Sequence, residues 1–389
     1  MTASANAGNT GKTEVPTVPG RLPLLGHTAA MPRQRLAFTS QSRNHGPVVQ
    51  VYLGKLPLHV VITAELAHQV LTGDTDKFDK GIFVDKLRRA FGNGLVSTDG
   101  EFRRRQRRMI QPAFHRGPLT RYSETMTALA AELANSWRDG QVLELDRVMQ
   151  DLAITAVGRT LFSTDFGPSV SAEIRAHTPA LIRLGVIRAL SPAALEKLPI
   201  PANRRFDRAV AHVHRVVDDV VDSARGDRDD LLSVLLNARD VSSGAAMDRQ
   251  QVRDEAELRR YPLWLMLRRA NTSVSLGDVR VPAGTEVGFS PHALHHDPRY
   301  YDDPARFDPN RWLPERAALP KGAYVPFAGG LHRCPGHAFA PLEIAIVAAT
   351  LAARRRLVPV PGEPVRPKVT GLLYPNRLPM TAHHRRSAP

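Results

Sequence analysis

The sequence predicts a mainly α-helical protein with small β-sheets, and three observations support this. Apolar residues recur at helical spacing over much of 64–240. Two short runs between 47 and 63 are rich in β-branched residues, and the chain beyond about 265 breaks into apolar–polar alternations around Gly and Pro. With 389 residues, 42% of them hydrophobic, the chain can bury a large core.

The first elements follow a polar leader over residues 1–15, which lacks an apolar signal core. We expect the remainder, 16–389, to form a single domain. The runs "PVVQVYLG" (47–54) and "LHVVIT" (58–63) are separated by a short connection, which predicts a β-hairpin.

Helices are predicted next. Residues 203–225 carry valines at helical spacing, so they predict a helix with one apolar stripe, and 229–240 predicts another amphipathic helix. The stripe comprises Val210, Val213, Val217, Val220 and Val221. Near the C-terminus, "FAPLEIAIVAATLAARRR" predicts a strongly apolar helix with a basic end, as the helix dipole favours.

Composition restricts the compartment and the partners. No apolar run approaches the ~20 residues that cross a bilayer, so we expect no membrane anchor. A single cysteine excludes an intrachain disulfide and indicates a reducing, cytoplasmic compartment. The net charge of +15 indicates an acidic partner. No aromatic-interleaved basic stripe is present, so we do not expect nucleic-acid binding.

The only cysteine, Cys334, lies in "FAGGLHRCPG". A lone cysteine is ordinarily a small buried apolar residue. Here Gly329 and Gly330 permit a tight turn, and Pro335 suits the first turn of a helix. Cys334 is therefore expected at a helix N-terminus, where unpaired N–H groups favour a thiolate. Such a thiolate is a metal or haem ligand, or a nucleophile.

Four fixed positions around this cysteine match a known signature. Phe327, Gly330, Cys334 and Gly336 fit Phe-x-x-Gly-x-x-x-Cys-x-Gly, and the chain thereby resembles the cytochrome P450 family of haem-thiolate monooxygenases. Three further stretches resemble family segments in the same order: "RRRQRRMIQPAFH" the C helix, "ELRRYP" the end of the K helix, and "FDPNRW" the segment before the haem loop. The resemblance extends from about 16 to 380. It is strongest to soluble bacterial members and includes terpene-oxidising ones.

The resemblance implies the cytochrome P450 fold and a cofactor, haem b (iron protoporphyrin IX). Cys334 would be the axial ligand of the iron and would favour O–O cleavage. His332, Arg103, Arg107 and Arg268 would bind the haem propionates, since the arginine fork matches a carboxylate. Arg103 stands where many members carry Trp or His.

The resemblance also implies partners. Residues 101–120 hold six arginines against one glutamate, and such a run is often only a solvated helix face. We expect Arg104, Arg105 and Arg108 to face solvent where the family docks acidic ferredoxins. The substrate would be a hydrophobic small molecule such as a terpenoid. Candidate pocket residues, each equally readable as ordinary core, are the loop 83–98, Leu263, Trp264, Met266, Leu372 and Leu373.

The stretch "QQVRDEAELRRYP" (250–262) begins like the family's I helix and ends like its K helix. The I helix normally carries Ala/Gly-Gly-x-Asp/Glu-Thr, whose acid and alcohol relay protons to bound oxygen. That motif is missing here, and "AGTEV" (283–287) is a decoy in a strand-like segment. The sequence therefore predicts an internal deletion near 256 with no catalytic acid–threonine pair retained.

The same junction alters a structural pair of the family. Arg259 and Arg311 align with the K-helix and loop arginines, but Ala256 occupies the glutamate position. Glu255, four residues before Arg259, lies about 40° away around the helix and is a partial substitute. Two interpretations stay open: a haem-thiolate monooxygenase, or a haem-binding deletion remnant without oxygenase activity.

A second histidine-rich motif is "HALHHDP", with His295 and His296 adjacent. No cysteine or acidic residue completes a recognisable metal-ligand spacing around this pair. We therefore interpret it as a turn after a strand.

Overall fold

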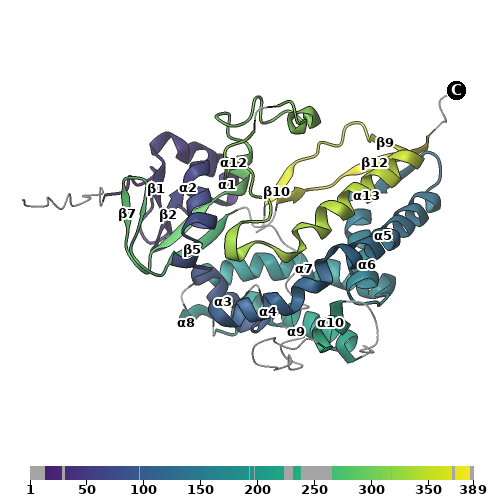
Figure 1. The fold of residues 1–389 in the computed structure, drawn as a ribbon, viewed down its shortest axis with the longest axis horizontal. Helices are drawn as coiled ribbons and strands as arrows, with labels where there is room; N and C mark the ends of the chain where they lie inside the picture. Colours follow the sequence, from purple (N-terminus) through teal and green to yellow (C-terminus); the bar gives the residue numbers. More distant parts are fainter. Residues whose placement is uncertain are drawn as a thin grey trace, which may run out of the picture. The chain divides into compact units, whose positions relative to one another are not determined.

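In the computed structural model, the described residues are 14–28, 31–95, 97–191, 193–196, 198–222, 231–237, 265–316, 318–369 and 373–385. The chain divides into two compact units, each built from two stretches of sequence (Figure 1). The first unit comprises Met1–Phe83 and Leu263–Arg333, and the second comprises Val84–Pro262 and Cys334–Pro389.

The first unit contains a five-stranded sheet with the order β1-β2-β8-β5-β3. Strands β2 and β8 are parallel, and the other neighbours are antiparallel. The pairing of Leu53 with Leu56 closes β1 and β2 into a hairpin, which confirms the sequence prediction. The strands are β1 (Val48–Leu53), β2 (Leu56–Val61), β3 (Phe78–Asp79), β5 (Met266–Ala270) and β8 (Glu286–Phe289).

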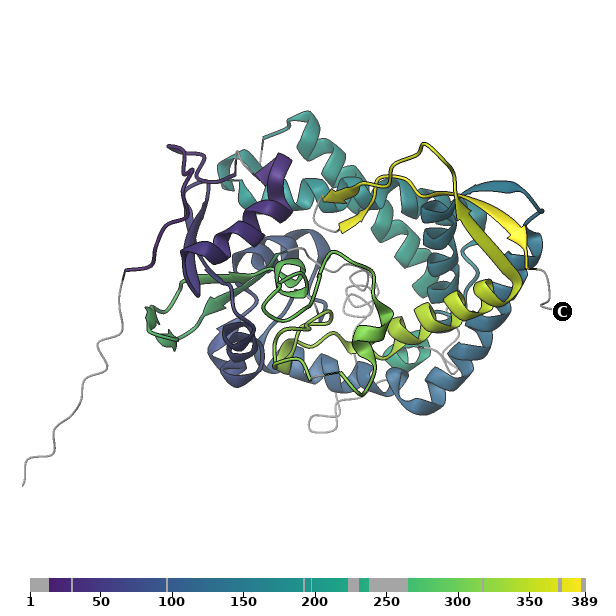
Figure 2. The same cartoon turned by 90° about the horizontal axis from the view of Figure 1, so that it is seen from above.

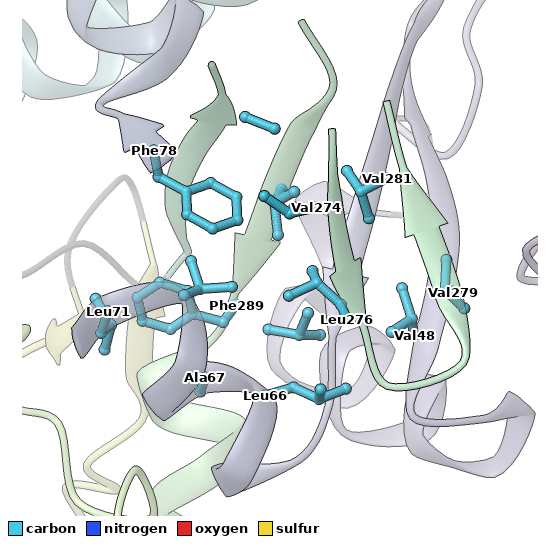
Figure 3. Packing of buried hydrophobic residues seen from close by; sticks show 14 of the residues in the cluster. Val48, Leu66, Ala67, Leu71, Phe78, Val274, Leu276, Val279, Val281 and Phe289 are labelled. Carbon is cyan, nitrogen blue, oxygen red and sulfur yellow. The ribbon is translucent and has the colours of Figure 1, made fainter. Parts of the chain in front are cut away.

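The core of the first unit brings this sheet together with a small hairpin and a short helix (Figure 3). The hairpin pairs β6 (Val274–Leu276) with β7 (Val279–Val281), and the helix is α2 (Ala64–His68). Strands β6 and β7 alternate buried and exposed residues, as a strand with one covered face does. The labelled cluster comprises Val48, Leu66, Ala67, Leu71, Phe78, Val274, Leu276, Val279, Val281 and Phe289.

Two short helices of the first unit start with hydroxyl caps. Thr63 accepts a hydrogen bond from the Leu66 amide before α2, and Ser290 accepts one from the Ala293 amide before α12. The remaining helical elements are α1 (Met31–Gln41), η1 (Ser42–His45), the π-turn η2 (Gln69–Gly73), η3 (Thr75–Lys77), α12 (Pro291–His295), η5 (Pro309–Trp312) and η6 (Gly330–His332).

The second unit is mainly helical, as predicted for the region from 64 to 240. Helix α3 (Gly81–Phe91) runs into it from the first unit. Its other helical elements are α4 (Gly100–Ile110), η4 (Gln111–Phe114), α5 (Arg116–Ser136), α6 (Leu145–Leu161), α7 (Gly167–Leu190), α8 (Ala193–Glu196), α9 (Pro201–Asp222), α10 (Leu231–Asn237), η7 (Pro335–His337) and α13 (Phe339–Arg354). Helices α9 and α10 confirm the predictions for 203–225 and 229–240 over their described residues, with Val220 and Val221 buried.

Small sheets complete the second unit. Strand β12 (Pro379–His384) pairs with β4 (Gln141–Glu144) on one side and β9 (Arg355–Pro359) on the other. A two-stranded sheet joins β10 (Pro367–Val369) and β11 (Leu373–Pro375). Helix α13 packs along α5, and Figure 2 shows it leading directly into β9.

By length and composition, the helix Pro335–Arg354 is able to cross a membrane. Our expectation that no apolar run approaches this length was therefore wrong. A single helix of this kind is weak evidence of a membrane span, because the core helix of a soluble protein passes the same test.

Candidate functional site

Cys334 is half-buried and directly precedes the turn η7. The Cys334 carbonyl accepts hydrogen bonds from the His337 amide at 3.3 Å and from the His337 ring Nδ1 at 2.9 Å. The prediction of a helix N-terminus is thus confirmed as a three-residue 3-10 turn that leads into α13. A Cβ at Gly336 would lie 3.8 Å from the Cys334 Sγ, which is an ordinary van der Waals contact, so Gly336 lies directly beside the sulfur.

In the first unit, the turn that precedes Cys334 requires a glycine. Gly330 has φ +57°, and a Cβ there would meet the Leu71 carbonyl oxygen and lie 2.8 Å from the Thr75 hydroxyl. The Thr75 hydroxyl accepts a hydrogen bond from the Leu331 amide at 3.3 Å. The signature glycine therefore lets this loop pack tightly on η2 and η3.

Helix α4 separates its arginines by face. Arg103 is 4% exposed and Arg107, one turn later, is half-buried. Both side chains therefore extend from the inward-facing side of the helix. Arg104 and Arg108 are exposed, which confirms the prediction for these two. Arg105 is half-buried, so its predicted exposure was wrong, because it is adjacent to the buried residues of the inward side.

The other predicted propionate ligands belong to the first unit. Arg268 is 6% exposed within β5, and its Nη1 donates to the Leu267 carbonyl at 2.7 Å. The next residue, Arg269, instead pairs with Asp79 at 2.7 Å. His332 ends η6 and is half-buried. Cys334, Arg103 and Arg107 thus share the second unit, whereas Arg268 and His332 lie in the first.

An aromatic core anchors the segment after Cys334 in the second unit. The Phe339 ring packs edge-on against Phe114 and Tyr122, with ring centroids 6.5 and 5.9 Å away. Ile110 of α4 belongs to the same buried cluster. The beginning of α13 and the end of α4 therefore share one core, which places the thiol and the two inward arginines on elements fixed to each other.

This residue set fits a haem. The described residues contain no group of three or more His, Cys, Asp or Glu side chains able to hold a metal ion. Cys334 would be a lone thiolate ligand, which suits an iron whose other equatorial ligands are porphyrin nitrogens. Buried arginines suit two propionate carboxylates.

Several predicted residues lie outside the described residues: the junction 250–262 with Arg259, and the pocket candidates Leu263, Trp264 and Leu372. Met266 is half-buried and packs against the core of the first unit, which agrees with its reading as a core residue. Leu373 is exposed at the start of β11.

Arg311 organises its own loop. Its guanidinium donates to the carbonyl oxygens of Asp302, Asp303, Arg306 and Asp308, at 2.9–3.3 Å. Among the described residues it forms no ion pair with a carboxylate. The loop before the haem signature is thus closed by backbone contacts. The predicted partnership of Arg259 and Arg311 with a K-helix carboxylate such as Glu255 stays a prediction, because Glu255 and Arg259 lie outside the described residues.

The histidines near 295 form a short helix rather than the predicted turn, because Ser290 caps α12. The His295 Nε2 accepts a hydrogen bond from the Val325 amide at 3.0 Å, and the rings of His292 and His296 stack 4.1 Å apart. Burial lowers the pKa of both His292 and His295 to about 4. These side chains therefore have a packing role.

Glu286, the acid of the decoy "AGTEV", is buried in β8. Its Oε1 accepts a hydrogen bond from the Ile82 amide at 2.9 Å, in the first turn of α3. An acceptor there satisfies an otherwise unpaired helix N–H. Glu286 therefore has a structural role, which supports reading this string as a decoy.

Comparison with known proteins shows the family to which this chain belongs. The sequence model of the cytochrome P450 family matches residues 16–256 and 250–381. The chain therefore belongs to the cytochrome P450 family and is, by family, an oxidoreductase of the monooxygenase class. The family implies haem iron as cofactor.

Relatives of assigned activity cover nearly the whole chain. Cyclooctat-9-en-7-ol 5-monooxygenase of Streptomyces melanosporofaciens is 35% identical over 438 aligned positions, covering 95% of each chain. Pentalenene oxygenase of Streptomyces avermitilis is 32% identical and covers 93% of this chain and 96% of its own. The predicted resemblance to bacterial terpene oxygenases is confirmed.

Solved structures support the fold. The retinoic acid-bound cyanobacterial CYP120A1 superposes with a TM-score of 0.81 at 19% identity, covering 96% of this chain and 100% of that chain. The predicted fold class, mainly α with small β-sheets, is thereby confirmed.

The sequence analysis missed the polar residue that joins α4 to the loop before it. Gln106 is 1% exposed and bonds to Asn93 and Thr98. Its only sequence signal is an uncharged side chain within "RRRQRR", at the inward spacing of three residues from Arg103.

Proposed function

We propose that this protein hydroxylates a terpenoid in the cytoplasm, with O2 and two electrons from a ferredoxin. Substrate, O2, two electrons and two protons would give the alcohol and water. The observation that carries the proposal is the thiol of Cys334, presented beside Gly336 on a segment packed against the arginine-bearing helix α4.

The proposed cofactor is haem b. Cys334 would bind its iron, and Arg103 and Arg107 of α4 would bind its propionates. The family resemblance assigns the propionate-binding role to Arg268 and His332 as well. When bound, the haem supplies the redox-active iron that activates O2. The protein's own residues hold its carboxylates in fixed charge-assisted hydrogen bonds.

The substrate class rests on the relatives. Two Streptomyces enzymes, at 35% and 32% identity, are named for the oxidation of cyclooctat-9-en-7-ol and of pentalenene. Such substrates offer mainly apolar surface, so an apolar pocket would select them by burial and shape.

The exposed arginines of α4 are the proposed ferredoxin contact. Arg104 forms a surface ion pair with Glu101, and Arg108 is exposed one turn later. Surface charges of this kind raise the rate at which two proteins associate more than they raise the affinity of the complex.

Replacing both residues (Arg104→Glu with Arg108→Glu) should weaken binding of a negatively charged bacterial ferredoxin roughly ten-fold at low salt, and the difference should shrink as salt screens the charges. Arg204→Glu with Arg208→Glu is a matched control, because these arginines are also exposed and four residues apart on α9. Equal weakening by both pairs, or by neither, would exclude α4 as the contact.

One observation favours a second candidate function, a haem-binding protein without oxygenase turnover. The family model matches in two stretches that meet at 250–256. The alignment with cyclooctat-9-en-7-ol 5-monooxygenase has 438 positions and covers 95% of the 389 residues of this chain. This chain therefore supplies about 370 of those positions, and about 68 have no counterpart here. These facts support an internal deletion of the I-helix acid–threonine pair, which relays protons during oxygen activation.

An absorption spectrum of the purified chain, reduced and bound to carbon monoxide, tests the haem proposal. We expect the red-shifted Soret band of thiolate ligation, and its loss in Cys334→Ser. Under the second candidate function the parent chain has no turnover, insertion of a relative's intervening segment at Ala256 restores terpene turnover, and a polar linker of equal length does not. A haem-free parent chain would refute the haem proposal. Terpene turnover by the parent chain would refute the second candidate function, a haem-binding protein without oxygenase turnover.

A further inference from the structure

The loop Gly92–Asp99 of the second unit folds into a compact turn before α4. The amides of Ser97 and Thr98 donate to the Gly94 carbonyl at 3.0 and 3.1 Å, and the Ser97 hydroxyl lies 2.7 Å from the Gly92 carbonyl oxygen. Ser97 and Thr98 are 1% and 4% exposed. Gly94, Leu95, Ser97 and Thr98 are buried, so the position of this turn depends on its anchors.

Gln106 anchors this loop to α4. Its Nε2 donates to the Asn93 carbonyl at 3.0 Å, and its Oε1 lies 3.2 Å from the Thr98 hydroxyl. The single hydroxyl proton is shared with the Gly94 carbonyl at 2.9 Å. Because a backbone carbonyl can only accept, Nε2 must face Asn93, and this fixes the orientation of the whole carboxamide.

The same face of α4 carries the inward arginine. Gln106 follows Arg103 by three residues, and both are among the buried residues of this helix. Leu95 of the loop belongs to the buried cluster that contains Ile110 and Phe339. The loop thus packs against the side of α4 from which Arg103 projects, while Arg88 of α3 donates to the Ser97 carbonyl at 2.8 Å as a second anchor.

We infer that Gln106 is a positioning residue of the cofactor site. By clamping the loop Gly92–Asp99 onto α4, it sets the direction in which Arg103 and Arg107 present their guanidinium groups to the haem propionates. This inference rests on the proposed haem function. The neutral, buried amide of Gln106 would position the arginines without itself pairing with a charge.

The test measures haem transfer from the holoprotein to excess apomyoglobin, followed by its Soret band. Gln106→Leu keeps the side-chain size but removes both hydrogen bonds, so haem loss should accelerate roughly ten-fold. In an Arg103→Gln, Arg107→Gln background the same change should accelerate it less than about two-fold, since a residue that acts through the two arginines loses its effect when both are gone. Thr98→Val should act in the same direction and more weakly, and serves if Gln106→Leu does not fold.

Gln111→Leu is the matched control, because Gln111 is exposed at the end of the same helix, and it should leave haem loss unchanged. Equal acceleration by Gln106→Leu in both backgrounds would show a general stability effect and overturn the inference, as would no acceleration in the parent background. A parent chain without the thiolate band would instead refute the haem proposal itself, so the two failures are distinguishable.

Discussion

The sheet core of the first unit and helix α13 of the second are both strongly apolar in sequence, yet they differ in burial. Val281, Val287 and Phe289 in the sheet core are each 0% exposed. In α13, Phe339 and Leu351 are buried, whereas Ile344 is 68% exposed. The exposed positions follow helical spacing, and their apolar members are Pro341, Ile344, Ala345, Ala348, Ala349, Ala352 and Ala353.

We propose that this difference arises from the predicted deletion near 256. A helix that is apolar on all sides is expected to be covered on all sides. Among the described residues, α13 is covered mainly by α5, and its outer side presents a continuous small apolar face. This is what the proposed deletion would leave behind, since each apolar Å² left in water forfeits about 25 cal/mol.

The largest effect we expect is in the covered core. Phe289→Ala should destabilise the first unit by about 3–5 kcal/mol, because a close-packed site cannot collapse around the missing ring. Chemical denaturation followed by hydrogen exchange of the sheet amides would measure it. Phe307→Ala is the matched control at 90% exposure in the same unit, and it should change stability by less than about 0.5 kcal/mol. Similar losses from the two substitutions would contradict the burial contrast.

The sequence predicted the parts of this structure that periodicity and turn chemistry determine. The β1–β2 hairpin, helix α9 and the turn at Gly330 follow from alternation, 3.6-residue spacing and glycine placement. The burial of individual side chains was harder to predict from the sequence. Arg105 lies closer to the inward side than its charge suggested, and Gln106 bonds to a loop whose fold no local pattern reveals.

A smaller effect should appear with pH in the first unit. Burial lowers the pKa of His292 and His295 from 6.5 to about 4. The unfolded chain therefore binds protons at a higher pH than the folded one, so stability is full above pH 6.5 and declines as pH falls towards 4. We expect about 1–2 kcal/mol per histidine after allowing for partial exposure.

Denaturation midpoints of the first unit between pH 7 and pH 4 would measure this decline. The double replacement His292→Gln with His295→Gln should flatten it, whereas His45→Gln, an exposed histidine of the same unit, should not. An unchanged slope in the double variant would assign the acid sensitivity to other groups.

The smallest change in stability is expected for a substitution in α13, and it tests whether the exposed face of this helix is uncovered. Ile344→Lys should change the stability of the second unit by less than about 0.5 kcal/mol, because a charged side chain at an exposed helix position keeps its hydration. In the chain with the relative's segment inserted at Ala256, the same lysine would be buried without a partner and should cost several kcal/mol. Denaturation of both chains, each with and without the lysine, gives the comparison. A large loss already in the parent chain would mean that the face is covered there, and the deletion would then not explain the exposed stripe.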